Sequence, residues 1–214
     1  MHTPLDDPRI EALATALATR EAPPQARSAA GSEPTTDQVA RASVALVVRP
    51  APSDLELLVI KRATRAGDPW SGHLAFPGGR QSPEDDSARA TAERETAEEV
   101  GIRLAHDGRF LGPLDPVWPR SGAPSVVVAP FVFAVTSGVD LVLNHEVADA
   151  FWIPLRTLTA PGSATEYLHA LAEGEELRFP AIAYESHVIW GLTHRIMTEF
   201  LDIVRHALDG EGAG

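Results

Sequence analysis

The chain has 214 residues, the length of one domain with a short extension, since domains average roughly 100–200 residues. Its 30 acidic residues outnumber 18 basic ones and give a formal net charge of −12, which argues against nucleic acid or an anionic membrane surface as a partner. It contains no cysteine, so disulfide frameworks, Cys-ligated zinc and thiol nucleophiles are excluded.

No targeting or membrane segment is apparent. No run approaches the roughly 20 apolar residues that span a bilayer. The first residues, MHTPLDDPR, carry acids where a secretory signal would lead into an apolar stretch. We therefore expect a cytoplasmic protein.

The first predicted element is a helix over residues 7–20. Its apolar residues recur at helical spacing: Ile10, Leu13, Ala14 and Leu17. Residues 21–37 are rich in Pro, Ser, Ala and Thr, which predicts a flexible linker. We interpret residues 1–40 as an N-terminal arm that is dispensable for chemistry, followed by a globular domain over 41–208 and a disordered tail over 209–214.

The globular part mixes strands and helices. Aliphatic, β-branched and aromatic runs predict strands at 42–49, 55–61, 102–111, 125–136 and 151–155, with two more within 179–189. Helices are predicted at 87–100, ended by Gly101, and at 192–208. Pro130 implies that its strand lies at an edge or carries a bulge. Because strands and helices do not alternate strictly, we expect an α+β or sandwich-type α/β domain.

The helix at 87–100 carries three carboxylates on one side. At about 100° per residue, Glu95, Glu98 and Glu99 fall within one arc. Such an all-oxygen set suits Mg²⁺ or Mn²⁺, and the alternative is a solvated acidic face. The preceding Gly78-Gly79 pair favours a site, because glycines let the backbone come close to a metal or a phosphate.

The segment from Gly78 to Ile102 resembles the Nudix box: G, five residues, E, seven residues, then REUxEExGU, where U is a bulky aliphatic. The second half of the box is matched by Arg94-Glu95, Glu98-Glu99, Gly101 and Ile102. The resemblance implies a sandwich of α/β/α type, with a mixed β-sheet flanked by helices. It also implies divalent metal ligands at Glu95, Glu98, Glu99 and a backbone carbonyl of the glycine turn, assigned to Gly79, with Arg94 orienting the carboxylates.

Two positions depart from the box. Thr96 stands where an aliphatic residue is expected. The interval from Gly79 to Arg94 is one residue longer than in the standard box, so the first acid of the box has no unique position. Three acids compete for it: Glu84, Asp85 and Asp86.

An upstream motif resembles the coenzyme A pyrophosphatase branch of the Nudix family. That branch has LL, a gap, R followed by Ser or Ala, another Arg, then G, three residues and FPGG. The corresponding residues here are Leu57-Leu58, Arg62-Ala63, Gly72 and Phe76-Pro77-Gly78-Gly79. The interval from Arg62 to Gly72 is one residue longer, and the second Arg is displaced to Arg65.

Several residues near this motif are candidates for substrate binding. Lys61, Arg62 and Arg65 suit a polyanionic substrate beside the metal site, and the alternative is surface basics that flank a strand end. Trp70 is a candidate for stacking on a base, or else a lid on the core. Gly78 completes the set, because its backbone can approach a phosphate.

Later residues give weaker signals. Glu146 precedes the strand at 151–155 and is a candidate metal ligand or proton acceptor, or else a plain surface acid. We interpret Trp152 and Trp190 as core residues. The histidines are interpreted as core or surface residues: His145, His187 and His194.

The resemblance implies a Mg²⁺- or Mn²⁺-dependent hydrolase of a pyrophosphate bond in a nucleoside diphosphate linked to another moiety, with coenzyme A or its derivatives as leading substrates. Metal ions would neutralise the phosphate oxygens and activate water, and Glu98, Glu99 or Glu146 would accept the proton. ADP-ribose, dinucleoside polyphosphates and modified nucleoside triphosphates are alternative substrates. A non-catalytic nucleotide-binding module is the rival from another class, and a homodimer is the assembly that we allow for.

Overall fold

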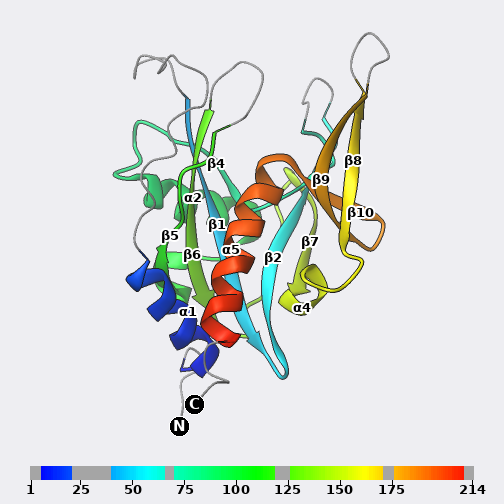
Figure 1. Ribbon diagram of the computed structural model, residues 1–214. Coiled ribbons are helices and arrows are strands. Elements are labelled where there is room, and N and C mark those ends of the chain that lie inside the picture. The colour runs from blue at the N-terminus through cyan, green and yellow to red at the C-terminus, as the bar shows by residue number, and fades with distance from the viewer. Residues whose placement is uncertain (1–5, 21–39, 66–69, 119–125, 171–175, 210–214) are drawn as a thin grey trace.

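The computed structural model describes residues 6–20, 40–65, 70–118, 126–170 and 176–209 (Figure 1). The strands of the larger sheet are β1 (Ala40–Ala51), β2 (Asp54–Arg62), β3 (Leu74–Ala75), β4 (Gly78–Arg80), β5 (Gly108–Pro113), β6 (Val126–Val135) and β7 (Val147–Pro154). A smaller sheet holds β8 (Ala164–Ala170), β9 (Glu176–Tyr184) and β10 (His187–Trp190). The helices are α1 (Pro8–Thr19), α2 (Ala88–Val100), α3 (Leu104–Asp107), α4 (Leu155–Leu158) and α5 (Gly191–Asp209).

The larger sheet is mixed. Within the described residues its main order is β3-β2-β1-β6-β5, while β4 pairs with β1 and β7 pairs with β2. Strand β1 runs antiparallel to β2 and β4 and parallel to β6. Figure 1 shows this sheet with helices packed against it, which confirms the α+β class with a mixed sheet flanked by helices.

Both faces of β1 are buried, because successive side chains of a strand point to opposite faces. Leu46 and Val48 join one apolar cluster with residues of α1 and α5. Ala45 and Val47 join a second cluster on the other face, with Ala92 and Val100 of α2. The sheet therefore separates α2 from α1 and α5, and the second cluster anchors α2.

Helix α1 belongs to the core of the domain. Ile10, Leu13 and Leu17 are at most 5% exposed and lie in the same cluster as Phe200 of α5. Ion pairs join Arg20, just after α1, to Asp115 at 2.8 Å and to Glu199 at 2.6 Å. The arm therefore supplies apolar surface to the domain. The predicted linker at 21–37 and residues 210–214 of the tail lie outside the described residues, and the division at residue 40 stays a proposal.

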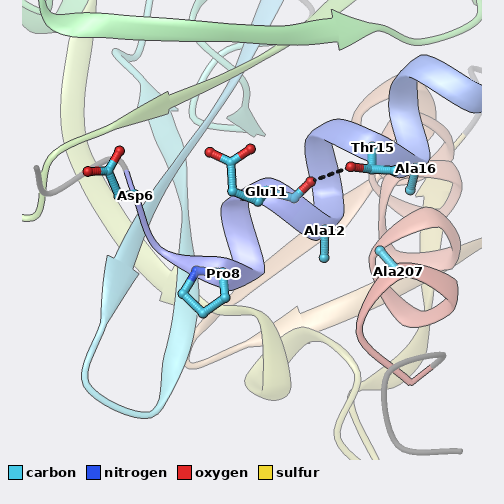
Figure 2. Close-up of a pocket in the computed structure, with 7 residues that line it drawn as sticks. All are labelled: Asp6, Pro8, Glu11, Ala12, Thr15, Ala16 and Ala207. Carbon is cyan, nitrogen blue, oxygen red and sulfur yellow. Dashed lines mark hydrogen bonds between the residues drawn. The ribbon is translucent and has the colours of Figure 1, made fainter. Parts of the chain in front are cut away.

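A surface pocket lies beside α1, on the side of the molecule opposite α2. Figure 2 shows the residues that line it: Asp6, Pro8, Glu11, Ala12, Thr15, Ala16 and Ala207. None of these described lining residues is basic. The pocket is therefore a poor place for a polyphosphate, and the candidate site lies across the sheet.

Truncating Leu13 to Ala is expected to lower the free energy of unfolding by about 2–5 kcal/mol, the usual range for a buried Leu. Catalytic rates should stay within a few-fold, because Leu13 lies in the cluster on the other face of the sheet from α2. Urea unfolding and steady-state kinetics measure the two effects. Thr15→Ala, on the exposed side of α1, is the matched control. An unchanged unfolding free energy for Leu13→Ala would contradict the docking of α1.

Three predictions of secondary structure are corrected. The segment 102–111 is not one strand: Leu104 enters the core from the short helix α3, and β5 begins only at Gly108. Strand β6, which contains Pro130, is not an edge strand, because it lies between β1 and β5. As for the alternative of a bulge, the register of β5 and β6 does shift, between Phe110 and Gly112 of β5. The carbonyl of Pro130 accepts a bond from Leu114 just beyond the end of β5. Strand β8 was not predicted at all.

Two tryptophans interpreted as core residues are only partly buried. Trp152 lies under the guanidinium of Arg49, whose Cζ is 4.2 Å from the ring centre. Trp190 stacks on Tyr167, with the ring centres 4.0 Å apart. Both rings therefore present part of their surface to solvent.

Candidate active site

Helix α2 is fixed at both ends and turns one carboxylate inward. The Ser87 side chain accepts the Ala90 N–H at 3.1 Å, and Gly101 ends the helix in a left-handed conformation with φ 77°. The buried residues of α2 are Thr91, Ala92, Thr96, Glu99 and Val100. Since Glu99 is only 3% exposed, its carboxylate faces the sheet rather than water.

The glycine turn lies directly against the carboxylates of α2. The N–H of Gly78 donates to Oε2 of Glu99 at 2.9 Å. A Cβ on Gly79 would stand 2.4 Å from Cδ of Glu95, so a side chain at this position would displace the Glu95 carboxylate. Because Gly78 and Gly79 pair with Val44 and Ser43 of β1, the sheet holds this turn in place. Two carboxylates of the helix therefore meet a rigid backbone.

The site concentrates negative charge. Burial, together with the charges of Glu95 and Glu146, raises the pKa of Glu99 to about 7, against the opposing effects of the Gly78 N–H and of Arg62. Burial also raises the pKa of Glu95, in spite of its hydrogen bond from Arg94. Glu146, from a loop remote in sequence, therefore acts electrostatically on both Glu95 and Glu99.

Arg94 joins several acids into one network. It donates from Nε and Nη2 to the two oxygens of Asp85, each at 2.9 Å. Its Nη1 donates to Glu95 at 2.9 Å and to Glu98 at 3.2 Å. A further bond reaches the Arg80 carbonyl at 3.2 Å, next to Gly79. Arg94 thus ties the glycine turn to the helix and restricts the carboxylates beside it.

The structure selects one of the three acids that compete for the first acid of the box. Asp85 binds Arg94 with both oxygens, and it also accepts the Ser82 N–H at 2.8 Å and the Thr91 hydroxyl at 2.9 Å. Glu84 instead contacts the Ser82 hydroxyl, and Asp86 is exposed. The spacing from Gly79 to Asp85 is that of the standard box, so the additional residue lies between Asp85 and Arg94.

Thr96 fits the position where an aliphatic residue was expected. It is fully buried, and its hydroxyl donates to the Ala92 carbonyl at 2.7 Å. A buried polar group that is hydrogen-bonded carries little penalty. The departure at Thr96 therefore leaves the geometry of α2 intact.

Asp85→Asn is expected to destabilise the protein at neutral pH, and the difference from wild type should shrink as the pH falls below about 4. The reason is that Arg94 holds the pKa of Asp85 well below its usual range. A lowered folded-state pKa gives stability that is present above the unfolded pKa and lost on acidification. Urea unfolding between pH 7 and 3 measures it. Asp86→Asn is the matched control, and equal effects of the two substitutions would contradict the selection of Asp85.

Arg62 and Arg65 lie at the same site. The N–H of Arg62 donates to the His73 carbonyl at 3.0 Å, and its charge acts on Glu99. Arg65 pairs with Glu146 at 3.0 Å. The alternation along β2 instead places Lys61 on the face of Val59, which belongs to the cluster with α5. The structure thus brings together two of the three candidate cations.

Trp70 is 51% exposed, so it is not a lid packed on the core. Residues 66–69, which complete the lengthened loop between Arg62 and Gly72, lie outside the described residues. Two contacts that hold Glu146 and Arg65 in place were not predicted from the sequence. One is the Asn144 side chain that accepts the Glu146 N–H at 2.8 Å, and the other is the Ser71 hydroxyl that accepts the Arg65 N–H at 2.6 Å.

The carboxylate oxygens at the site are of the type that a hard divalent ion binds, but their side chains do not converge on one point. Glu95, Glu98, Glu99 and Glu146 offer oxygens only, as Mg²⁺ and Mn²⁺ prefer. Glu98 is 55% exposed and turned toward Arg94. Within the described ranges, no three His, Asp or Glu side chains form a group that could hold a metal ion. A bound cation would stabilise the charged form of buried Glu99, which burial and the charges of Glu95 and Glu146 disfavour.

Comparison with known sequences decides the family. The family model described as the NUDIX domain matches residues 39–172, a span that includes the glycine turn, α2, Arg62, Arg65 and Glu146. This chain belongs to the Nudix family. The expectation of a pyrophosphohydrolase is thereby confirmed at the level of the family, whose hydrolases generally use divalent metal ions.

Three curated relatives of this Nudix protein have names that assign no substrate. An uncharacterized Nudix hydrolase NudL from Photorhabdus laumondii is 34% identical over 172 residues, which cover 79% of this chain and 88% of the relative. A protein of the same name from Yersinia pestis is 36% identical over 166 residues, covering 76% and 77%. An uncharacterized Schizosaccharomyces pombe protein is 41% identical over 114 residues, but these cover 51% of this chain and 35% of that protein.

A solved structure agrees on the fold. A MutT/nudix family protein from Enterococcus faecalis superposes with a TM-score of 0.55 at 16% identity, over 83% of this chain and 70% of that one. At this identity the likeness concerns the fold alone. In addition, no helix among the described residues is long and apolar enough to cross a membrane.

Proposed function

We propose that this Nudix hydrolase cleaves the pyrophosphate bond of a nucleoside diphosphate linked to another moiety, with coenzyme A or a derivative as the leading substrate. The observation that carries the proposal is the placement of buried Glu99 against the Gly78 N–H, with Glu95 and Glu146 acting on the same carboxylate. A buried carboxylate beside a glycine turn, with further acids acting on it, suits a divalent cation and an anionic substrate.

We assign Glu95, Glu98, Glu99 and the carbonyl of Gly79 to hold Mg²⁺ or Mn²⁺. A bound divalent ion supplies charge neutralisation at the phosphate oxygens and activation of the attacking water. Arg94 restrains Glu95 and Glu98 through its hydrogen bonds, and Asp85 restrains Arg94. Glu98, Glu99 and Glu146 remain the candidates for the group that accepts the proton from water.

Arg62 and Arg65 are proposed to bind the phosphates of the substrate. Both lie beside acids of the site, and both belong to the motif that resembles the coenzyme A branch. Coenzyme A carries a 3′-phosphate in addition to its diphosphate, so it needs more cations than ADP-ribose does. Lys61 belongs to the proposed set only by its position in the sequence. Trp70 and Gly78 complete the set, Trp70 as an exposed ring and Gly78 as a backbone position without a side chain beside the site.

The substrate proposal is tested by comparing coenzyme A with its 3′-dephospho form. A charge-assisted contact to phosphate contributes about 1.5–3 kcal/mol. Substitution by Ala of whichever arginine contacts the 3′-phosphate, Arg62 or Arg65, should therefore reduce the preference for coenzyme A roughly 10- to 150-fold and leave the rate on the dephospho form unchanged. Substitution of an arginine that contacts the diphosphate should instead lower both rates. The ratio of kcat/KM values measures this, with products identified by mass spectrometry. Arg205→Ala, an exposed arginine of α5, is the control.

Other outcomes separate the rival functions. Cleavage of ADP-ribose, a dinucleoside polyphosphate or a modified nucleoside triphosphate in place of coenzyme A would overturn the substrate and keep the chemistry. Binding of nucleotides without turnover of any of them would instead favour the non-catalytic module. The network of Arg94, Asp85, Glu95 and Glu98 counts against that rival, because a binding module has no need of it.

A further inference from the structure

An aromatic cluster covers one face of the smaller sheet, apart from the catalytic helix. Pairing places Tyr167 of β8 opposite Phe179 of β9, and Trp190 of β10 opposite Ala181 of β9. Because side chains alternate along a strand, Tyr167, Phe179 and Trp190 share a face with His169. Ile182 and Ile189 lie on the opposite face and belong to the core with α5.

The rings of this cluster pack on one another and keep part of their surface exposed. Tyr167 and Trp190 are stacked, with ring centres 4.0 Å apart and planes inclined by 17°. Phe179 and His169 flank Trp190, each with its ring centre 5.6 Å away. All four are only partly buried, and no described side chain of β8 is buried. None of the four belongs to either apolar core cluster, and partly exposed aromatic side chains that gather on one surface are typical of binding sites.

The cluster adjoins the catalytic segment through His73. The ring of His73 meets Trp190 edge-on at 5.1 Å and Tyr167 at 6.2 Å. The carbonyl of the same residue accepts the N–H of Arg62, whose charge acts on Glu99. Strand β10 also contacts β3, which leads into the glycine turn, and Figure 1 shows the smaller sheet beside β2 and β7.

We propose that the face formed by Trp190, Tyr167, Phe179 and His169 stacks the nucleobase of the substrate, while the diphosphate lies at Arg62 and the glycine turn. The inference rests on the proposed function, in which a nucleoside diphosphate is cleaved. In such a substrate the ribose separates the base from the diphosphate, as the segment at His73 separates the aromatic face from Arg62. Every nucleobase has a π-face, so an aromatic surface can stack any base without hydrogen bonds that distinguish one base from another.

This base site draws on a part of the chain beyond the family match. The NUDIX domain match ends at residue 172, whereas Phe179 and Trp190 lie after it. Tyr167 and His169 lie within the match, so the base platform is only partly formed by residues of the matched span. Substrate choice at the base can then vary without change to the carboxylates of α2.

Paired ligands that differ only by the base test the proposal. AMP and ribose 5-phosphate share a sugar phosphate, and neither contains an anhydride bond to be cleaved. Titration calorimetry on the full chain should show tighter binding of AMP. Trp190→Ala should lower the AMP affinity roughly 5- to 150-fold, the range for loss of one base–aromatic stack, and leave ribose 5-phosphate unaffected. Trp190→Phe should retain most of the AMP affinity, because it keeps a ring.

The controls separate this inference from the function on which it rests. Leu168→Ala removes a 46% exposed side chain from the opposite face of β8, and AMP affinity should not change. Unchanged AMP affinity in a folded Trp190→Ala protein would overturn the base site while nucleotide hydrolysis stands. Equal losses for AMP and ribose 5-phosphate, or a loss for pantetheine but not AMP, would overturn it as well. A wild-type protein that neither binds nor cleaves any nucleotide would instead overturn the proposed function.

Discussion

Glu99→Gln is expected to lower turnover by about 100- to 10,000-fold, the range for loss of a positioned proton-transfer group, while the fold survives. Gln keeps a carbonyl oxygen that can accept the Gly78 N–H, so the turn and helix stay joined. It removes the charge that is buried beside Glu95 and Glu146. The variant should therefore unfold at the same temperature as wild type or at a higher one. Steady-state kinetics and thermal unfolding measure the two effects.

Two further variants of the same helix, Glu98→Gln and Glu93→Gln, complete this test. Glu98→Gln should also lower turnover by orders of magnitude, although Glu98 is largely exposed and its loss should not affect stability. Glu93→Gln is the matched control, because Glu93 lies on the same helix but pairs with Arg89 instead of the site. A second readout is the affinity for Mn²⁺, which should fall in the Glu98 and Glu99 variants only. Near-normal turnover in both of these variants would refute the metal assignment.

The sequence predicts those parts of the fold that depend on local interactions, such as the caps of a helix. Helix α2 was predicted over its whole length, because Ser87 and Gly101 mark its ends. Helix α1 was predicted as well, but its spacing says nothing of what covers Ile10 and Leu13, and only the structure places them against α5. Strand β8 escaped prediction because none of its described side chains is buried, so its composition carries no apolar pattern.

The site shows the same limit. Counting along the box left Glu84, Asp85 and Asp86 open, and the ambiguity ends only when Asp85 is seen to hold Arg94 with both oxygens. Sequence spacing does not predict that the Glu99 side chain points inward or that it accepts the Gly78 N–H, because both features depend on the pairing of β4 with β1. Long-range pairing also brings Glu146 beside Arg65, which lies far from it in the sequence.

The two glycines of the turn are expected to respond differently to the same added methyl group. In Gly79→Ala the Cβ would meet the end of the Glu95 side chain at 2.4 Å, and this flexible end can move aside. Stability should therefore change little. Turnover should fall on the order of 100-fold, because displacement of a reacting group by about 1 Å has that effect.

In Gly78→Ala the Cβ would instead lie 2.2 Å from the Ser43 carbonyl oxygen and 2.7 Å from the Val44 Cα, which are backbone atoms and cannot turn away. The φ of Gly78 is 156°, a conformation that residues with a side chain rarely adopt. Backbone strain alone is worth about 1–3 kcal/mol, so this variant should lose stability as well as activity. Urea unfolding and kcat on the same preparations separate the two cases. If Gly79→Ala kept full turnover, Glu95 would not need its position against the turn, and its assignment to the metal would fail.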